Sequence, residues 1–536
     1  MPLRPRIRKT VTLTVALSAA GAVALAGCTS GSGSPASAGS SAGGSASGSP
    51  GNSAAAGTGQ ATSLQWRSCT VSGVTGVSMK CANLKVPLDY RHPSGRKITI
   101  ALSEVPATAP ASQQQGDLLV NPGGPGGPGR SLAAAVAQGL DPNVAAEYNI
   151  IGFDPRGVGA SVPALSCDPS FFSGVRPNYI PASQAAEQVL INRARTYAAG
   201  CEQRFGWLLP YLTTVDVARD VDSIRVALNQ PKINYYAFSY GTYLGEVYAT
   251  LFPNRVRRMV LDSTVDPQGV WYTDNIDQDY AFQARMEAFF GWVAKYDSTY
   301  HLGSTTAQVQ QTWYTVRKRL AAQPITGPNG PMIGADEFDD TYLQGGYNNT
   351  LWPGLAQALS AYLLQNSAGP MVSQYEQNGA QVENEFAIYN AVQCSDVNWP
   401  RNWTKWDSDT RKVYSTAPFQ AWDNAWFNAA CAFWPVKGPA QPLKIGASGL
   451  PGILMLQGTL DAATPYAGAQ VAHQDLPTAR MVVVEGGGNH GQSLESPADS
   501  CVQGYLNRYL ANGALPTQPG AVNATCAPVP DPNPAS

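Results

Sequence analysis

The stretch Ile233-Asn-Tyr-Tyr-Ala-Phe-Ser239-Tyr-Gly-Thr-Tyr-Leu-Gly245 decides the fold that we expect for this 536-residue chain. Its first half is apolar and aromatic, as in a buried strand, and its second half is typical of a helix. Ser239 therefore stands at an abrupt turn, where a strained backbone lifts the hydroxyl above the sheet edge. Strand and helix nearly touch at such a turn, and the small residues Ala237 and Gly241 meet that steric need. We interpret Ser239 as a nucleophile; the alternative is a structural turn serine.

Two later strands run into residues that complete a catalytic triad. Leu450–Gly458 is a buried-strand pattern that leads to Asp461, and Arg480–Glu485 leads to the glycine loop that carries His490. A serine followed by an acid and then a histidine, each after a strand, is the order of the α/β-hydrolase fold. We expect His490 to take the serine proton and Asp461 to orient its imidazole.

The base can also be argued by elimination, because the chain has only four histidines. His92 precedes a Pro-Ser-Gly turn, His301 lies in a polar segment, and His473 falls within an expected helix. None of these three leaves a strand toward a glycine loop, whereas His490 does. The acid has one alternative, because Asp262 also ends an expected strand.

A loop of glycines and prolines, Asn121-Pro-Gly-Gly-Pro-Gly-Gly-Pro-Gly129, follows the short strand Leu118–Val120. Glycines let the backbone approach a substrate, while prolines stiffen the loop and offer no amide hydrogen. We expect an oxyanion hole here, with one donor from Gly123 or Gly124 and the other from the amide of Tyr240. A phosphate-binding loop is disfavoured, because the loop has no Lys-Ser/Thr ending and no dinucleotide spacing.

These motifs resemble the α/β-hydrolase peptidases related to prolyl aminopeptidase, and most closely the secreted tripeptidyl-aminopeptidase-like branch of actinobacteria. The turn Asp154-Pro-Arg-Gly-Val-Gly-Ala-Ser161 and the segment Gln457-Gly-Thr-Leu-Asp-Ala-Ala-Thr-Pro465 also look like that family, and the resemblance runs from about Trp66 to Cys526. It implies hydrolysis of peptide bonds near a free amino terminus, by an acyl-enzyme route without metal or cofactor. Relatives with this triad include tripeptidases, proline-selective enzymes and carboxylesterases, so the exact substrate does not carry over.

An aminopeptidase must also hold the protonated amino terminus of its substrate, and buried carboxylates are the usual means. We expect one or two of Glu383, Glu385 and Asp396 to do so, the alternative being a charged helix face that meets solvent. Two other functions stay open. A carboxylesterase or lipase would share the triad, and a non-catalytic surface-binding lipoprotein would normally have lost one of its members.

The first 28 residues predict export. Four basic residues between positions 4 and 9 precede the apolar stretch Val11–Ala26, which is too short for a stable spanning helix. Leu25-Ala26-Gly27-Cys28 looks like a lipobox, which would place a diacylglycerol on Cys28 and tether the protein to the outer face of the plasma membrane. An ordinary secretory signal is the alternative. Removal of residues 1–27 changes the net charge from −2 to −6, and no basic patch suggests nucleic acid.

Composition divides the remaining chain into a linker, a core and a cap. Residues 28–63 are almost wholly Gly, Ser, Ala and Pro, which predicts a flexible linker. Strands alternate with helical patterns over residues 64–265 and 447–536, which predicts an α/β core with a mainly parallel sheet. Residues 266–446 are helical, aromatic and rich in tryptophan, and look like a large cap inserted after the sixth strand. Nothing in the sequence indicates an oligomeric state.

Eight cysteines follow Cys28, an even number in a chain that we expect to be exported. Pairing of sequence neighbours gives four disulfides, although other connectivities are permitted. Metal binding is the alternative, and it lacks any C-x-x-C spacing. The expected pairs are Cys69–Cys81, Cys167–Cys201, Cys394–Cys431 and Cys501–Cys526.

Overall fold

The centre of the protein is a ten-stranded sheet with the order β1-β2-β3-β5-β4-β6-β7-β10-β11-β12. The structure is a computed structural model that describes residues 64–327, 330–495 and 497–534, so the predicted signal peptide, linker and Cys28 lie outside the described residues. The strands are β1 (Arg67–Cys69), β2 (Met79–Pro87), β3 (Lys97–Val105), β4 (Gly116–Asn121), β5 (Tyr148–Asp154), β6 (Ile233–Ser239), β7 (Val256–Thr264), β10 (Ile453–Gly458), β11 (Ala479–Val484) and β12 (Ala524–Cys526).

The sheet is mainly parallel, as predicted. From β5 to β12 in the sheet order every pairing is parallel, while β1, β2 and β3 form an antiparallel edge. Helices cover both faces, which explains why the central strands read as nearly continuous apolar runs. In β6, Tyr235 and Ala237 belong to a core cluster on one face of the sheet, and Tyr236 and Phe238 belong to a second cluster on the other face.

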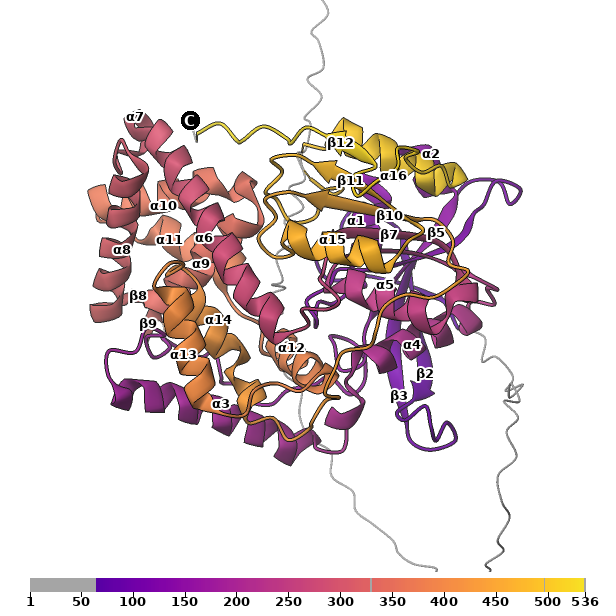
Figure 1. The fold of residues 1–536 in the computed structure, drawn as a ribbon, viewed down its shortest axis with the longest axis horizontal. Helices are drawn as coiled ribbons and strands as arrows, with labels where there is room; N and C mark the ends of the chain where they lie inside the picture. The colour runs from indigo at the N-terminus through magenta and orange to yellow at the C-terminus, as the bar shows by residue number, and fades with distance from the viewer. Residues whose placement is uncertain (1–63, 328–329, 496, 535–536) are drawn as a thin grey trace, which may run out of the picture.

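The helices of the core connect these strands on the two faces of the sheet (Figure 1). They are α1 (Leu132–Gly139), α2 (Pro142–Ala146), α4 (Thr214–Ala227), α5 (Tyr240–Leu251), α15 (Tyr466–Asp475) and α16 (Ser500–Asn512), with the short turns η1 (Leu209–Tyr211) and η2 (Pro253–Arg255).

A large, mostly helical segment lies between β7 and β10 and forms a body beside the sheet (Figure 1). It has its own core, in which Phe282, Trp313 and Trp352 are buried. It follows β7, the seventh strand in chain order, whereas the sequence placed it after a sixth strand. Its elements are α6 (Tyr272–Lys295), α7 (Asp297–Tyr300), α8 (Thr306–Ala322), β8 (Ile325–Gly327), β9 (Gly330–Ile333), α9 (Ala335–Tyr347), η3 (Asn349–Leu351), α10 (Trp352–Leu364), α11 (Gly369–Gln374), η4 (Tyr375–Gly379), α12 (Glu383–Asp396), α13 (Trp403–Tyr414), α14 (Ala421–Asn428) and η5 (Ala429–Ala432).

Helix α3 (Gln184–Phe205) precedes the nucleophile strand in the chain, yet it packs on the cap. Its Leu190 and Ile191 share a buried cluster with Trp422 and Trp426 of α14. Figure 1 shows α3 running beneath α13 and α14. The helical layer is therefore built from two separate segments of the chain, whereas the sequence pattern placed α3 with the core.

The turn after β5 is held by a buried ion pair. Arg156 donates to both carboxylate oxygens of Asp220 on α4 at 2.7 Å, and neither side chain is accessible to solvent. Tyr90 donates a further hydrogen bond of 2.7 Å to the same carboxylate. Bidentate pairs of this kind fix geometry strongly. Arg156, which lies in the Asp154–Ser161 turn, therefore has a structural role.

The four disulfides join the predicted pairs, Cys69–Cys81, Cys167–Cys201, Cys394–Cys431 and Cys501–Cys526. This confirms the pairing of sequence neighbours. In the part of the chain that the structure describes, no helix combines the length and the apolar character that crossing a membrane would require.

Candidate active site

Ser239 forms a sharp turn between β6 and α5. Its φ of 56° and ψ of −133° are strained for any residue other than glycine. A side chain at Gly241 would place its Cβ 2.6 Å from Asn121 Oδ1 and 2.9 Å from the Cβ of Ala237. These contacts give the physical reason for the small residues that flank the serine. The strand, turn and helix that the sequence predicts are all present.

Asp461 and His490 lie together at the ends of their strands. His490 Nδ1 is 3.0 Å from each carboxylate oxygen of Asp461. The buried carboxylate also accepts hydrogen bonds from the amides of Ala463 at 3.0 Å and Thr464 at 3.1 Å, so its orientation is fixed. Burial by itself lowers the pKa of His490, but the negative charge and hydrogen bond of Asp461 and the charge of Asp262 outweigh it. The net effect is a pKa of His490 above its usual value.

The other ring nitrogen of His490 remains available. Nε2 is buried and makes no hydrogen bond within the described residues, so the half-buried Ser239 hydroxyl does not donate to it here. Hydrogen bonds between nucleophile and base are often long before substrate binds. The loop is nevertheless fixed beside the turn, because the amide of Gly491 donates to Ser263 Oγ at 2.8 Å, at the end of the strand next to β6.

Asp262, the alternative acid, contacts the histidine loop at a different point. Its fully buried carboxylate accepts hydrogen bonds from the amides of Gln492 at 2.8 Å and Ser493 at 2.9 Å, and from the Ser493 hydroxyl. Burial raises the pKa of Asp262 to about 6. Asp461 is therefore the carboxylate that bonds the imidazole, and Asp262 holds the residues that follow His490.

The glycine loop lies directly against the serine turn. A Cβ on Gly123, whose φ is +100°, would stand 2.8 Å from the Ser239 Cβ and 3.1 Å from the Tyr240 amide nitrogen. The amide of Gly123 donates to Asn121 Oδ1 at 3.0 Å. The amides of Gly124 and Tyr240 form no hydrogen bond with any residue that the structure describes.

Two of the three carboxylates expected to bind an amine are occupied by the protein itself. Glu383 accepts from the Cys167 amide and the Tyr197 hydroxyl, both at 2.8 Å. Asp396 accepts from the amide of Thr214 at 2.7 Å and from its hydroxyl at 2.5 Å. Both carboxylates tie α12 to neighbouring segments, which is a structural use.

Glu385 differs from these two in position and partners. A Cβ on Gly126 would stand 2.6 Å from the Glu385 carbonyl oxygen, so the first turn of α12 lies over the glycine loop. The half-buried carboxyl of Glu385 has no hydrogen bond or ion pair in the described part of the chain, and burial raises its pKa to about 7.

Sequence reasoning missed Tyr347 at the end of α9. Its carbonyl oxygen accepts a hydrogen bond from the His490 amide at 2.8 Å, and the two rings lie nearly perpendicular with centroids 5.5 Å apart. Burial, with the charges of Asp461 and Asp423, raises the pKa of Tyr347 to about 12. A single tyrosine within a long helical segment has no sequence signal that would place it against the histidine.

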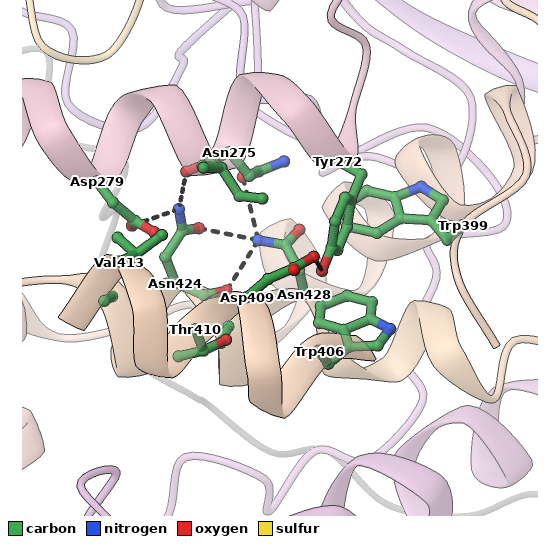
Figure 2. Close-up of a pocket in the computed structure, with 13 residues that line it drawn as sticks. Tyr272, Asn275, Asp279, Trp399, Trp406, Asp409, Thr410, Val413, Asn424 and Asn428 are labelled. Atoms are coloured by element: carbon green, nitrogen blue, oxygen red, sulfur yellow. Dashed lines mark hydrogen bonds between the residues drawn. The ribbon is translucent and has the colours of Figure 1, made fainter. Parts of the chain in front are cut away.

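A small cavity lined by apolar and polar side chains lies elsewhere, in the cap between α6, α13 and α14 (Figure 2). Its volume of about 30 Å³ is enough for one or two water molecules. Asp279 on its wall accepts a hydrogen bond of 2.9 Å from Asn424, and burial raises the pKa of Asp279 to about 8. None of the predicted site residues lines this cavity. Over the described ranges, no group of three or more His, Cys, Asp or Glu side chains is arranged to hold a metal ion.

Comparison with known proteins agrees with this geometry. Residues 118–496 match the family model described as the alpha/beta hydrolase fold. The chain is 39% identical over 496 residues to the tripeptidyl aminopeptidase of Streptomyces coelicolor, and the match covers 90% of each protein. It is 29% identical over 482 residues to the serine protease Hip1 of Mycobacterium tuberculosis, covering 84% of this chain and 89% of that protein. It is 30% identical over 485 residues to carboxylesterase B of the same species, covering 86% and 90%. The chain therefore belongs to the α/β-hydrolase fold family, among the relatives of the Streptomyces tripeptidyl aminopeptidase.

Proposed function

We propose that this protein is a serine exopeptidase of the tripeptidyl or prolyl aminopeptidase type, which hydrolyses peptide bonds near the free amino terminus of peptides. The observation that carries the proposal is the strained Ser239 at the end of β6, beside a loop in which His490 is bonded to the buried Asp461. The relatives that are named as peptidases support the same reading.

In the proposed reaction Ser239 Oγ attacks the scissile carbonyl carbon while His490 Nε2 takes the hydroxyl proton. The imidazolium then gives that proton to the departing amine, and water hydrolyses the acyl-enzyme with His490 again acting as base. Asp461 keeps the hydrogen on Nδ1 and stabilises the charged ring. All of these groups come from the chain itself.

The amides of Gly124 and Tyr240 are the donors that we assign to the oxyanion hole. Both are free of other hydrogen bonds among the described residues, and the glycine loop touches the turn that carries Tyr240. Gly123 has its amide occupied by Asn121, so we assign it a steric role. Loss of one donor of this kind raises the reaction barrier by about 3 kcal/mol.

Glu385 is the carboxylate that we assign to the substrate amino terminus. Its carboxyl lacks an internal partner, and its helical turn lies over the loop that would hold the scissile carbonyl. Pairing a half-buried carboxylate with an ammonium group removes the cost of leaving that charge alone. Glu383 and Asp396 already have partners, so we do not assign them to the substrate.

A carboxylesterase is the second candidate function. One relative that is 30% identical is named carboxylesterase B, and an esterase would use the same serine, acid and histidine. The free Glu385 favours the peptidase, because an acyl ester has no amino terminus for that carboxylate to bind.

We also propose that the mature protein is exported and tethered to the plasma membrane through a lipid on Cys28, with residues 28–63 as a linker. The four disulfides support export, because such bonds persist in oxidising compartments. The functional unit would be a core of residues 64–265 and 447–536 with residues 266–446 as its cap.

A panel of amino-terminally free di-, tri- and tetrapeptide anilides, assayed beside short-chain esters, tests the function. We expect release of aniline from free peptides by the wild-type protein and none by Ser239→Ala. N-acetylated anilides should give a much lower kcat/KM than the free peptides. Equal kcat/KM for free and acetylated substrates would reject an exopeptidase, and a strong preference for esters would favour the second candidate.

A further inference from the structure

The carboxyl-terminal tail connects the sheet to the cap. It leaves the sheet after β12, and Figure 1 shows it running from β12 toward the cap helices. The carbonyl oxygen of Pro532 accepts a hydrogen bond of 2.9 Å from Trp292 Nε1 on α6. Asp531 Oδ1 accepts a hydrogen bond of 2.9 Å from Asn349 Nδ2 on η3. The tail is therefore anchored in both parts of the molecule.

The partner of Asp531, Asn349, is itself bonded to the histidine loop. The backbone amide of Asn349 donates to Asn489 Oδ1 at 2.9 Å, and Asn489 Nδ2 donates back to Asn349 Oδ1 at 3.1 Å. Both side chains are buried. His490 follows directly in the chain, and its own amide donates to the carbonyl oxygen of Tyr347. The cap backbone thus holds two successive residues of the loop that carries the imidazole.

Asp531 and Asn489 together set which way the Asn349 amide faces. An asparagine side chain has a donor end and an acceptor end, and the two are not interchangeable. Because Nδ2 donates to Asp531, Oδ1 is turned toward the Nδ2 group of Asn489. Without that acceptor, the Asn349 side chain loses one of the two contacts that fix its orientation. Asn489 Nδ2 also donates to Glu495 Oε1 at 2.9 Å, so we expect the support of the loop to weaken rather than to disappear.

A buried arginine lies against the same loop and feels the charge of the tail carboxylate. A Cβ on Gly488 would stand 2.2 Å from Arg285 Nη1, so the guanidinium lies directly on the loop two residues before His490. Arg285 is buried, and its Nε and Nη2 have no hydrogen-bond partner among the residues described. Burial lowers the pKa of Arg285, and the negative charges of Asp531 and Asp461 oppose that effect.

We propose that Asp531 is a positioning residue for His490, acting through Asn349 and Asn489. This rests on the proposed function, in which His490 is the base. The tail residue contacts neither reacting atoms nor substrate in this role; it fixes the amide pair that holds the loop. Misplacement of a reacting group by about 1 Å costs on the order of 100-fold in rate, so a partial loss of this support is expected to lower kcat roughly tenfold.

The test compares Asp531→Ala with Asn533→Ala, a matched change at an exposed tail residue that has no hydrogen bond in the described structure. Asp531→Ala should lower kcat for a peptide anilide roughly tenfold, leave KM within about twofold, and slow fluorophosphonate labelling of Ser239 by the same factor as kcat. Asn533→Ala should match the wild type. Asp531→Asn keeps an acceptor oxygen and should recover most of the loss.

A double-mutant cycle between Asp531 and Asn349 provides the second measurement. In an Asn349→Ala background, Asp531→Ala should cost nothing further, because its route to the histidine is already gone. Wild-type kcat and labelling rate in Asp531→Ala, full additivity of the two variants, or an equal loss in Asn533→Ala would each overturn the proposal. Failure of the proposed function would appear differently, as a wild-type protein that the probe does not label.

Discussion

At the residue scale, two carboxylates that end neighbouring strands have different tasks. Asp461 faces Nδ1 of His490 with both oxygens, whereas Asp262 is occupied by the backbone of the two residues after Gly491. Both charges favour the protonated imidazole. Only Asp461 can select the tautomer of His490 in which Nε2 is free to accept a proton from the serine.

Substitution of these two acids separates their roles. Asp461→Asn should lower kcat by about 10⁴-fold, because an amide no longer holds the required tautomer or stabilises the imidazolium. Asp262→Asn should cost much less and should move the acidic limb of the kcat/KM profile to lower pH, because it removes a charge that raises the pKa of His490. Steady-state kinetics from pH 5 to 9 would measure both effects. A loss in Asp262→Asn as large as that in Asp461→Asn would reassign the acid.

Glu385 gives a prediction about substrate binding. Its pKa of about 7 means that the carboxylate is charged mainly above pH 7, so KM for free peptides should rise as pH falls through that value. Glu385→Gln should raise KM for free peptide anilides and leave N-acetylated ones unchanged. Glu376→Gln removes an exposed carboxylate from the same cap and serves as the control. A KM that is insensitive to both pH and Glu385→Gln would contradict the assignment.

At the element scale, the active site depends on the close approach of the glycine loop to the turn between β6 and α5. The loop can lie there because Gly123 has no side chain and adopts a φ of +100°. In the proposed oxyanion hole, the same contact would bring the amides of Gly124 and Tyr240 toward one side of Ser239. Steric fit between two elements would therefore set the geometry of the proposed electrostatic stabilisation.

Gly123→Ala tests this fit. Its Cβ would stand 2.6 Å from the Phe238 carbonyl oxygen and 2.8 Å from the Ser239 Cβ, so the loop must move and activity should fall at least 100-fold, as estimated for displaced donors. Gly174→Ala is the matched control, because its φ of +73° is also positive but nothing lies within 4 Å of the added Cβ. Activity assays with thermal denaturation of both variants would show whether contact, rather than backbone strain, causes the loss. Equal losses of activity would contradict this reading.

The sequence predicted those strands and helices that have a local pattern of apolar and turn residues. The strands before Ser239, Asp461 and His490 are continuous apolar runs that end at turn residues, and each is present with its end near the expected position. The packing of α3 on the cap was not predictable in this way. An amphipathic pattern identifies a buried face such as that of Leu190, but it does not say which distant segment covers that face.

At the scale of the whole molecule, the cap is joined to the core by polar contacts. The sequence did not predict which acidic side chains make these contacts. Glu383, Glu385 and Asp396 lie on one helix, and the sequence alone gives no reason to prefer one of them as the carboxylate that binds the substrate. Only the folded chain shows that Glu383 and Asp396 bond neighbouring segments while Glu385 has no internal partner. The contacts of Asp531 could not be predicted either, because they join residues that are far apart in the chain.

The cap cavity gives a prediction about stability. Asp279 has a pKa of about 8 in the folded protein, above the usual value, so the folded state holds a proton that the unfolded state has released between about pH 4 and 8. Its contribution to the free energy of unfolding is therefore greatest at low pH and declines as pH rises to about 8. Asp279→Asn should remove this decline and, relative to wild type, gain at least about 1 kcal/mol between pH 5 and pH 8. Urea unfolding of both proteins at the two pH values would measure it, and parallel pH dependence would contradict it.

The central claim is that Ser239 is made nucleophilic by the His490–Asp461 pair, and covalent labelling tests it most directly. The folded, mature protein would be treated with a fluorophosphonate probe, beside Ser239→Ala and His490→Ala, and each adduct located by peptide mass mapping. We predict a single adduct on Ser239 of the wild type, no adduct in Ser239→Ala and a greatly slowed reaction in His490→Ala. An unlabelled wild type, or labelling that persists in Ser239→Ala, would contradict the claim.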